Sequence, residues 1–139
     1  RLAFAIETFL RRERTGQVFV APLDVVFSNF DLTEPDLLYV SNERRQVLTK
    51  KNVQGAPDLA VEVLSASTAY RDRGAKQQIY ERFGVREYWI IDPEADTIDR
   101  IVFAPSGFVH YLRAGDELVT ELLPGFSLDL EAFFREEGV

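Results

Sequence analysis

The first fourteen residues alternate between apolar and polar positions with the period of a helix. The apolar positions lie three and four residues apart, on one helical face: Leu2, Ala5, Ile6, Phe9 and Leu10. A charged stretch follows at 11–14, and Thr15-Gly16 ends the pattern. We therefore expect an amphipathic helix that packs one side against the core.

Short apolar segments follow, with the length and composition of β-strands. We expect strands at 17–20, 23–27, 36–40 and 58–64. The first two are either separate strands or one strand broken at Ala21-Pro22, because proline cannot donate a hydrogen bond to a neighbouring strand. The polar stretch 41–54 has room for at most one turn of helix. The strand at 58–64 is apolar on both faces, which predicts a central position in a sheet.

A second helix divides these strands from a second group. Ala75, Ile79 and Phe83 lie at helical spacing, and Gly84 can end that helix. Its candidate N-caps are Ser65, Ser67 and Thr68. Further strands are expected at 87–91, 97–103 and 108–112, the last two as a hairpin, and a short helix at 128–134. Together these elements predict a mixed α/β domain.

The composition narrows the class of protein. The chain has 139 residues, 46% of them hydrophobic and 12% aromatic, which suits a single domain over residues 1–139. The sequence contains neither an apolar run of membrane-spanning length nor a signal-peptide pattern, so we expect a cytoplasmic protein without membrane association. With no cysteine and one histidine, His110, any bound metal ion must be held mainly by oxygen.

The net charge of −7 argues against a protein that coats nucleic acid without selectivity, because such binding rests on accumulated Lys and Arg. A local basic face is still compatible with this charge. Basic residues cluster at 11–14, 44–51 and 71–76. A DNA-binding face would require the second and third clusters, which include Arg44, to gather beside the site.

A carboxylate interrupts the predicted central strand. Because side chains alternate along a strand, Glu62 shares a face with Asp58 and Ala60. A buried carboxylate without partners is strongly unfavourable, so Glu62 needs a cation, hydrogen-bond donors or access to water. A salt bridge to Arg or Lys and a role as ligand of a divalent metal ion are both compatible with this position.

Asp36 and Lys76 are candidate companions of Glu62. Asp36 begins another apolar strand, and two carboxylates from neighbouring strands form a minimal oxygen site for Mg²⁺. Lys76 flanks the apolar stripe of the second helix, where its ammonium can face the same place. The alternative is a surface lysine paired with Asp72 at i−4.

Four motifs, in this order, resemble a known family. They are Pro35-Asp36-Leu37-Leu38-Tyr39-Val40, Ala56-Pro57-Asp58 continuing through Glu62 to Thr68, Arg71 to Lys76 with Tyr80, and Phe83-Gly84 continuing to Asp92-Pro93. The chain closely resembles the Uma-type "putative restriction endonuclease" family of the PD-(D/E)XK nuclease superfamily over nearly its whole length. The resemblance implies a restriction-endonuclease-like core: a central mixed β-sheet flanked by helices, with an added C-terminal β-hairpin.

The resemblance also implies a metal-dependent site that hydrolyses phosphodiester bonds, with DNA as the expected substrate. Asp36 matches the aspartate of the PD motif and Glu62 the acidic residue of the (D/E)XK motif, so both are expected to bind Mg²⁺ or Mn²⁺. The expected catalytic residues are Asp36, Glu62 and Lys76. The metal ion is expected to polarise the scissile phosphate and to lower the pKa of the attacking water.

The chain departs from the superfamily pattern in two places. Leu64 stands where the superfamily has a lysine, two residues after Glu62, and Lys76 matches the place to which the lysine has moved in this family. Family members carry further residues before the first helix, so we expect an N-terminal segment of the domain to be missing here. Asp58 lies four residues from Glu62, about 13 Å at strand rise, and we interpret it as structural or as indirect support of the site.

The other candidates leave several interpretations open. His110 is expected to have a structural partner, and Tyr80 can line the site or the core. An inactive nuclease-fold domain that serves as a binding or assembly module is an alternative function. A purely structural ion network is another. A homodimer also stays open, since two-fold dimers are common among nucleases that cut both strands.

Overall fold

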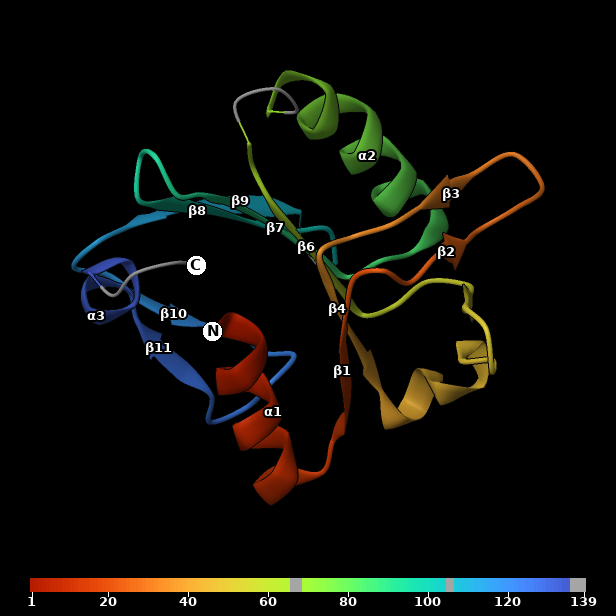
Figure 1. Cartoon of the computed structure of the whole chain (residues 1–139), viewed down its shortest axis with the longest axis horizontal. Helices are drawn as coiled ribbons and strands as arrows, with labels where there is room; N and C mark the ends of the chain where they lie inside the picture. Colours follow the sequence, from red (N-terminus) through yellow and green to blue (C-terminus); the bar gives the residue numbers. More distant parts are fainter. Residues whose placement is uncertain (66–68, 105–106, 136–139) are drawn as a thin grey trace.

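The computed structural model describes residues 1–65, 69–104 and 107–135, with side chains described in these ranges except at 69–73. A six-stranded sheet forms the centre of the fold, with strand order β1-β4-β6-β7-β8-β9 (Figure 1). The strands are β1 (Gly16–Val20), β4 (Leu37–Ser41), β6 (Leu59–Val63), β7 (Glu87–Asp92), β8 (Thr97–Val102) and β9 (Phe108–Arg113). Strands β6 and β7 are parallel and the other neighbours antiparallel. The prediction of a mixed α/β fold is therefore confirmed.

Strand β6 lies between β4 and β7, and the prediction of a central strand is confirmed. Its alternating side chains enter two different cores. Leu59 and Val61 pack in the core that contains the first helix, whereas Ala60 packs beside Tyr80 of the second. Glu62 shares the face of Ala60, and this alternation directs it toward the second helix.

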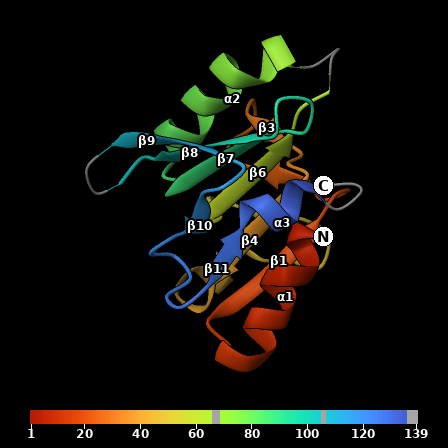
Figure 2. The same ribbon diagram turned by 90° about the vertical axis from the view of Figure 1, so that its left-hand side faces the viewer.

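Helix α2 (Ala69–Phe83) connects the parallel strands β6 and β7 and covers one face of the sheet (Figure 2). Parallel strands require such a crossover. The helix ends at Gly84, whose φ of 94° is the left-handed conformation that glycine adopts without strain. Val85 N–H donates to the carbonyl of Tyr80 at 3.0 Å, which completes a helix-terminating motif. The candidate caps Ser67 and Thr68 lie outside the described residues.

Helix α1 (Leu2–Glu13) covers the opposite face of the sheet (Figure 2). Leu2, Ile6, Phe9 and Leu10 are buried, as the helical periodicity predicts. The C-terminal segment packs in the same core and contains β10 (Glu117–Val119), β11 (Ser127–Asp129) and α3 (Leu130–Arg135). The predicted helix at 128–134 thus begins two residues later, because residues 128 and 129 pair with β10.

A small sheet, ordered β3-β2-β5, packs on one side of the central sheet. Its strands are β2 (Val25–Val26), β3 (Leu32–Thr33) and β5 (Val53–Gln54). Val25 and Val53 are buried against Leu38 and Val40 of β4. Between β4 and β5, the 3₁₀ helix η1 (Asn42–Val47) covers six residues, longer than the single turn predicted for this polar stretch.

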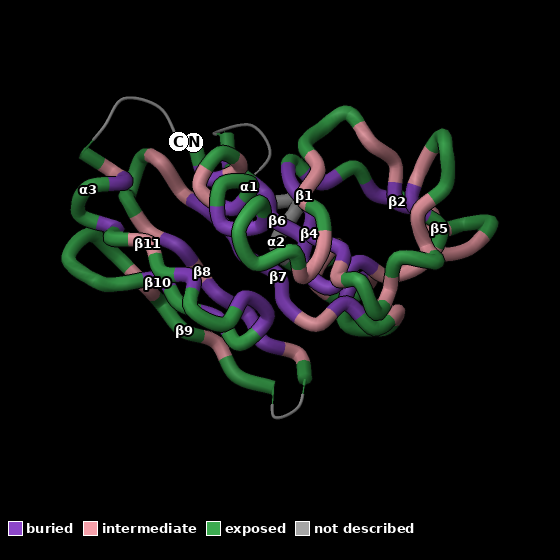
Figure 3. Tube along the Cα trace, turned by 90° about the horizontal axis from the view of Figure 1, so that it is seen from below, coloured by how far each residue is buried: buried purple, intermediate pink, exposed green. Residues whose placement is uncertain are grey.

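Buried residues concentrate in the inner strands of the large sheet (Figure 3). The edge strand β9 is mostly exposed. No helix in the described part of the chain has the length and apolar character needed to cross a bilayer.

Candidate functional site

Glu62 is a buried carboxylate on β6 that exposes only 3% of its surface. Its Oε2 accepts a hydrogen bond from Lys76 Nζ at 3.0 Å and another from the Tyr80 hydroxyl at 3.3 Å. Both donors come from α2. A cation and a phenol offset the cost of burying this charge, so Glu62 and Lys76 meet in the structure, and Tyr80 lines the same site.

Helix α2 presents Lys76 and Tyr80 together because residues four apart lie on one helical face. Tyr80 is completely buried, and its ring packs edge-on against Tyr88 with centroids 4.8 Å apart. The Lys76 side chain is 26% exposed. The phenol is thus fixed in the core, whereas the Lys76 side chain is partly open to solvent. The alternative partner of Lys76, Asp72, has a side chain outside the described residues.

Asp36 lies at the same end of β6 as Glu62. It precedes β4, where Leu37 pairs with Val61, so the same register places Asp36 across from Glu62. Asp36 is exposed, and its Oδ2 accepts a hydrogen bond from the Val63 N–H at 2.7 Å. One carboxylate oxygen of Asp36 is therefore held by the residue that follows Glu62.

A second pair of carboxyl groups involves a residue that closely precedes Asp36 in the chain. Glu34, two residues before Asp36, is exposed and shares a hydrogen bond with Asp24. This bond is the main cause that raises the pKa of Glu34, with smaller contributions from desolvation and from the charge of Asp24.

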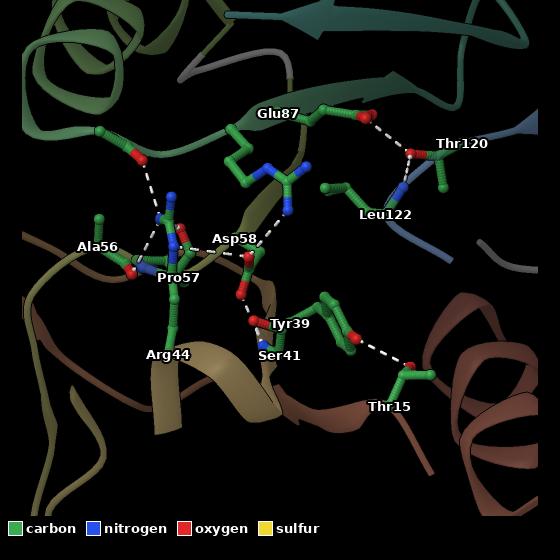
Figure 4. Close-up of polar contacts among 12 residues, drawn as sticks. Thr15, Tyr39, Ser41, Arg44, Ala56, Pro57, Asp58, Glu87, Thr120 and Leu122 are labelled. Atoms are coloured by element: carbon green, nitrogen blue, oxygen red, sulfur yellow. Dashed lines mark hydrogen bonds and ion pairs between the residues drawn. The ribbon is translucent and has the colours of Figure 1, made fainter. Parts of the chain in front are cut away.

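Asp58 lies at the opposite end of β6 and exposes 1% of its surface. Its Oδ1 is 3.6 Å from Arg44 Nε and 3.6 Å from Arg86 Nη1. Its Oδ2 accepts a hydrogen bond from the Ser41 N–H at 2.6 Å (Figure 4). These contacts join β4, β6 and η1, in agreement with the structural interpretation of Asp58.

Sequence comparison assigns the chain to a family. The model of the Uma2 family, described as "Putative restriction endonuclease", matches residues 1–131. The chain belongs to the Uma2 family. No curated protein sequence matches it.

A solved structure supports the predicted architecture of this Uma2 chain. It is the crystal structure of "a putative nuclease belonging to DUF820" from Anabaena variabilis, with a TM-score of 0.78 and 18% sequence identity. The match covers 96% of this chain and 76% of that chain. At this identity the likeness concerns the fold, and it agrees with the predicted restriction-endonuclease-like core.

The donor set of the Uma2 chain at this end of β6 suits a hard cation that needs few protein ligands. No group of three or more His, Cys, Asp or Glu residues within the described ranges is placed to hold a metal ion. Mg²⁺ usually takes one or two protein carboxylates and completes its coordination with water and substrate phosphates. Asp36 and Glu62 therefore fit Mg²⁺ by their chemistry, whereas a structural zinc site would require four ligands.

Arg44, one of the basic residues that a DNA-binding face beside Glu62 would require, lies away from that site. Arg44 lies at the Asp58 end of β6, and its Nη1 donates to the carbonyl of Pro57 at 3.2 Å (Figure 4). The same Nη1 donates to the carbonyl of Gly84 at 2.9 Å. These contacts give Arg44 a structural role, and it does not contribute to a basic face beside Glu62. The side chains of Arg71 and Arg73 lie outside the described residues.

A second buried ion pair was missed by the sequence analysis. Glu87 exposes 2% of its surface and accepts hydrogen bonds from Arg100 Nε at 2.9 Å and Arg100 Nη2 at 3.2 Å. Trp89 Nε1 and the Thr120 hydroxyl complete its partners, at 3.0 and 2.7 Å (Figure 4 shows Thr120). Arg100 Nη1 also lies 3.0 Å from His110 Nδ1, so the predicted structural partner of His110 is found.

Proposed function

We propose that the protein is a metal-dependent endonuclease that hydrolyses phosphodiester bonds, with DNA as substrate. The arrangement of Glu62 and Lys76 is the observation that supports this most. Their charged groups lie 3.0 Å apart at the end of β6 where the Asp36 carboxylate binds the Val63 amide. The description of the Uma2 family is the second support.

Asp36 and Glu62 are the residues that would hold Mg²⁺ or Mn²⁺. Such an ion, when bound, polarises a phosphoryl oxygen and lowers the pKa of bound water. The carboxylates are suited to this because Glu62 lies on β6, Asp36 directly precedes the neighbouring strand β4, and Asp36 is open to solvent.

Lys76 supplies a compact positive charge to the reacting phosphate. Negative charge increases on that phosphate in the transition state, and a fixed cation stabilises it. The four-carbon stem of lysine is flexible, so the ammonium can leave the Glu62 oxygen and contact a phosphate oxygen. In the absence of substrate, Lys76 balances the buried charge of Glu62 instead.

Tyr80 is a positioning residue in this scheme. Its hydroxyl donates to the same Oε2 of Glu62 that Lys76 contacts. Because the phenol ring is packed in the core, it holds the carboxylate in one orientation while Lys76 moves.

The test is the cleavage of end-labelled single- and double-stranded DNA, measured while Mg²⁺ is titrated. The parent protein should cleave in proportion to bound Mg²⁺, and Glu62→Ala should lower the rate by about 100-fold or more, as loss of a main electrostatic group does. Glu81→Ala removes an exposed carboxylate from the same helix and should leave the rate unchanged. Equal rates for Glu62→Ala and the parent protein would refute the proposal.

A calorimetric Mg²⁺ titration separates this function from that of an inactive binding module. The enzyme should bind Mg²⁺ at millimolar concentration, and Glu62→Ala should bind it more weakly. A protein that binds DNA without cleaving it and takes up no Mg²⁺ would support the module.

A further inference from the structure

A pocket of about 580 Å³ lies away from the candidate nuclease site. Its walls come from β8, β9, β10 and the segment 120–127. Arg100 in this wall pairs across strands with Trp89, which belongs to the core shared with α1. The pocket therefore lies on the sheet face opposite to that of Glu62. Its volume is in the range of sites that bind small molecules.

A buried arginine forms part of the pocket wall. Arg100 exposes 6% of its surface and still borders the pocket. Its Nε and Nη2 donate to Glu87, and its Nη1 donates to His110. A guanidinium carries five N–H groups, so one N–H on each terminal nitrogen has no partner among the described residues. These two groups are donors available to a ligand.

His110 adds a third donor of fixed position. Because arginine has no acceptor, Nδ1 of His110 must accept the hydrogen bond from Arg100. A neutral imidazole then carries its proton on Nε2, on the other side of the ring. His110 is exposed and borders the pocket, so this N–H is accessible.

The remaining walls are mainly apolar. Phe108 and Val119 border the pocket and are 39% and 48% exposed, which is high for large apolar side chains. The Phe108 ring lies 4.6 Å from the His110 ring, between centroids, and 5.9 Å from the Arg100 guanidinium. Pro124 and Phe126 complete an apolar region beside the donors.

The charged residues around the pocket favour a ligand that carries a single negative charge. Glu87 already balances Arg100 through two hydrogen bonds, and the exposed Glu121 also borders the pocket. These carboxylates disfavour phosphate esters and other multiply charged ligands, since like charges repel. A single carboxylate can still accept two parallel N–H groups from a guanidinium.

We propose that this pocket binds a small monocarboxylate that bears an aromatic or aliphatic group. The carboxylate accepts hydrogen bonds from Arg100 and His110, and the apolar group packs between Phe108 and Val119. The inference is independent of the nuclease proposal because it uses no residue of that site.

Phenylacetate is the probe for the test, and its neutral analogue phenylacetamide is the matched control. Binding is measured by calorimetry and by the fluorescence of Trp89, the sole tryptophan, which donates to the Glu87 carboxylate that holds Arg100. Phenylacetate should bind with a Kd of about 1 mM or lower. Phenylacetamide should bind about tenfold more weakly or worse, because its single neutral carbonyl oxygen accepts weaker hydrogen bonds than a carboxylate and cannot take two parallel N–H groups from Arg100.

Val119→Glu places a second carboxylate at the pocket without removing a buried partner, so it should fold and should weaken phenylacetate binding at least about tenfold. Tyr111→Glu, on β9 but outside the pocket wall, should bind phenylacetate as the parent protein does. Equal affinity for the two probes, unchanged binding in Val119→Glu, or no phenylacetate binding at about 10 mM would overturn the proposal. Tighter binding of inorganic phosphate than of phenylacetate would also overturn it.

Discussion

Replacement of Arg100 by leucine should lower the free energy of unfolding by about 3–5 kcal/mol. Arg100 and Glu87 form a bidentate ion pair, with Nε to Oε1 at 2.9 Å and Nη2 to Oε2 at 3.2 Å. Their side chains are only 7% and 3% exposed, so water can replace little of what is lost. Arg100→Leu leaves a buried carboxylate without a counter-charge.

The magnitude follows from the contacts that are removed. The substitution removes two hydrogen bonds to a charged group, each typically worth about 1.5–3 kcal/mol. Trp89 and Thr120 still donate to Glu87, which limits the loss. The expected loss of about 3–5 kcal/mol agrees with the usual cost of breaking a buried ion pair by removing one partner.

Urea denaturation followed by circular dichroism measures the effect. Arg135→Leu is the matched control, because its pair with Glu131 is 73% exposed on the arginine side and an exposed i,i+4 pair contributes only about 0.3–0.5 kcal/mol. The double variant with Glu87→Gln and Arg100→Leu should recover part of the lost stability, since no unpaired charge is left. A loss below about 1 kcal/mol for Arg100→Leu, or a double variant less stable than Arg100→Leu alone, would refute the reasoning.

Two further predictions concern stability at the β1–β4 edge of the sheet. Burial raises the pKa of the Tyr39 phenol, more than the hydrogen bond with Thr15 lowers it. At a pH between the unfolded and folded pKa values, Tyr39 keeps its proton only in the folded state, so the melting temperature should fall as the pH rises above about 10. Tyr39→Phe should reduce this fall. A melting temperature that depends on pH equally in Tyr39→Phe and in the parent protein would contradict the prediction. Gly16→Ala places a Cβ 2.8 Å from Ser41 Cα, so the backbone must move to make room for it. The substitution should lower the free energy of unfolding, measured by urea denaturation, by about 1–3 kcal/mol. A variant as stable as the parent protein would contradict this prediction.

Elements with a long repeating pattern could be predicted from the sequence. Helix α1 shows its apolar stripe over three turns, and β6 combines apolar side chains on both faces with a central place in the sheet. The short strands β3, β5, β10 and β11 have two or three residues each. Such strands are too short to show an alternating pattern, and they form only because distant segments pair with them.

The candidate site was predictable in part because some of its features are local in the sequence. The place of Glu62 on a central strand and of Lys76 beside an apolar helical stripe are local features, and the structure brings their charged groups together. The pairing of Glu87 with Arg100 depends on the register between β7 and β8, which the sequence does not specify. The binding of Arg44 to Asp58 depends likewise on the packing of η1 against the end of β6.

A titration with Mn²⁺ tests most directly the proposal that a divalent cation binds between Asp36 and Glu62. When Mn²⁺ is titrated into ¹⁵N-labelled protein, paramagnetic broadening should be strongest at the amides of Glu62 and Val63. It should be weaker at Arg86, near the Asp58 end of β6, and should be lost from Val63 in the variant that combines Asp36→Asn with Glu62→Gln. Broadening centred elsewhere, or equal in the parent protein and this variant, would contradict the claim.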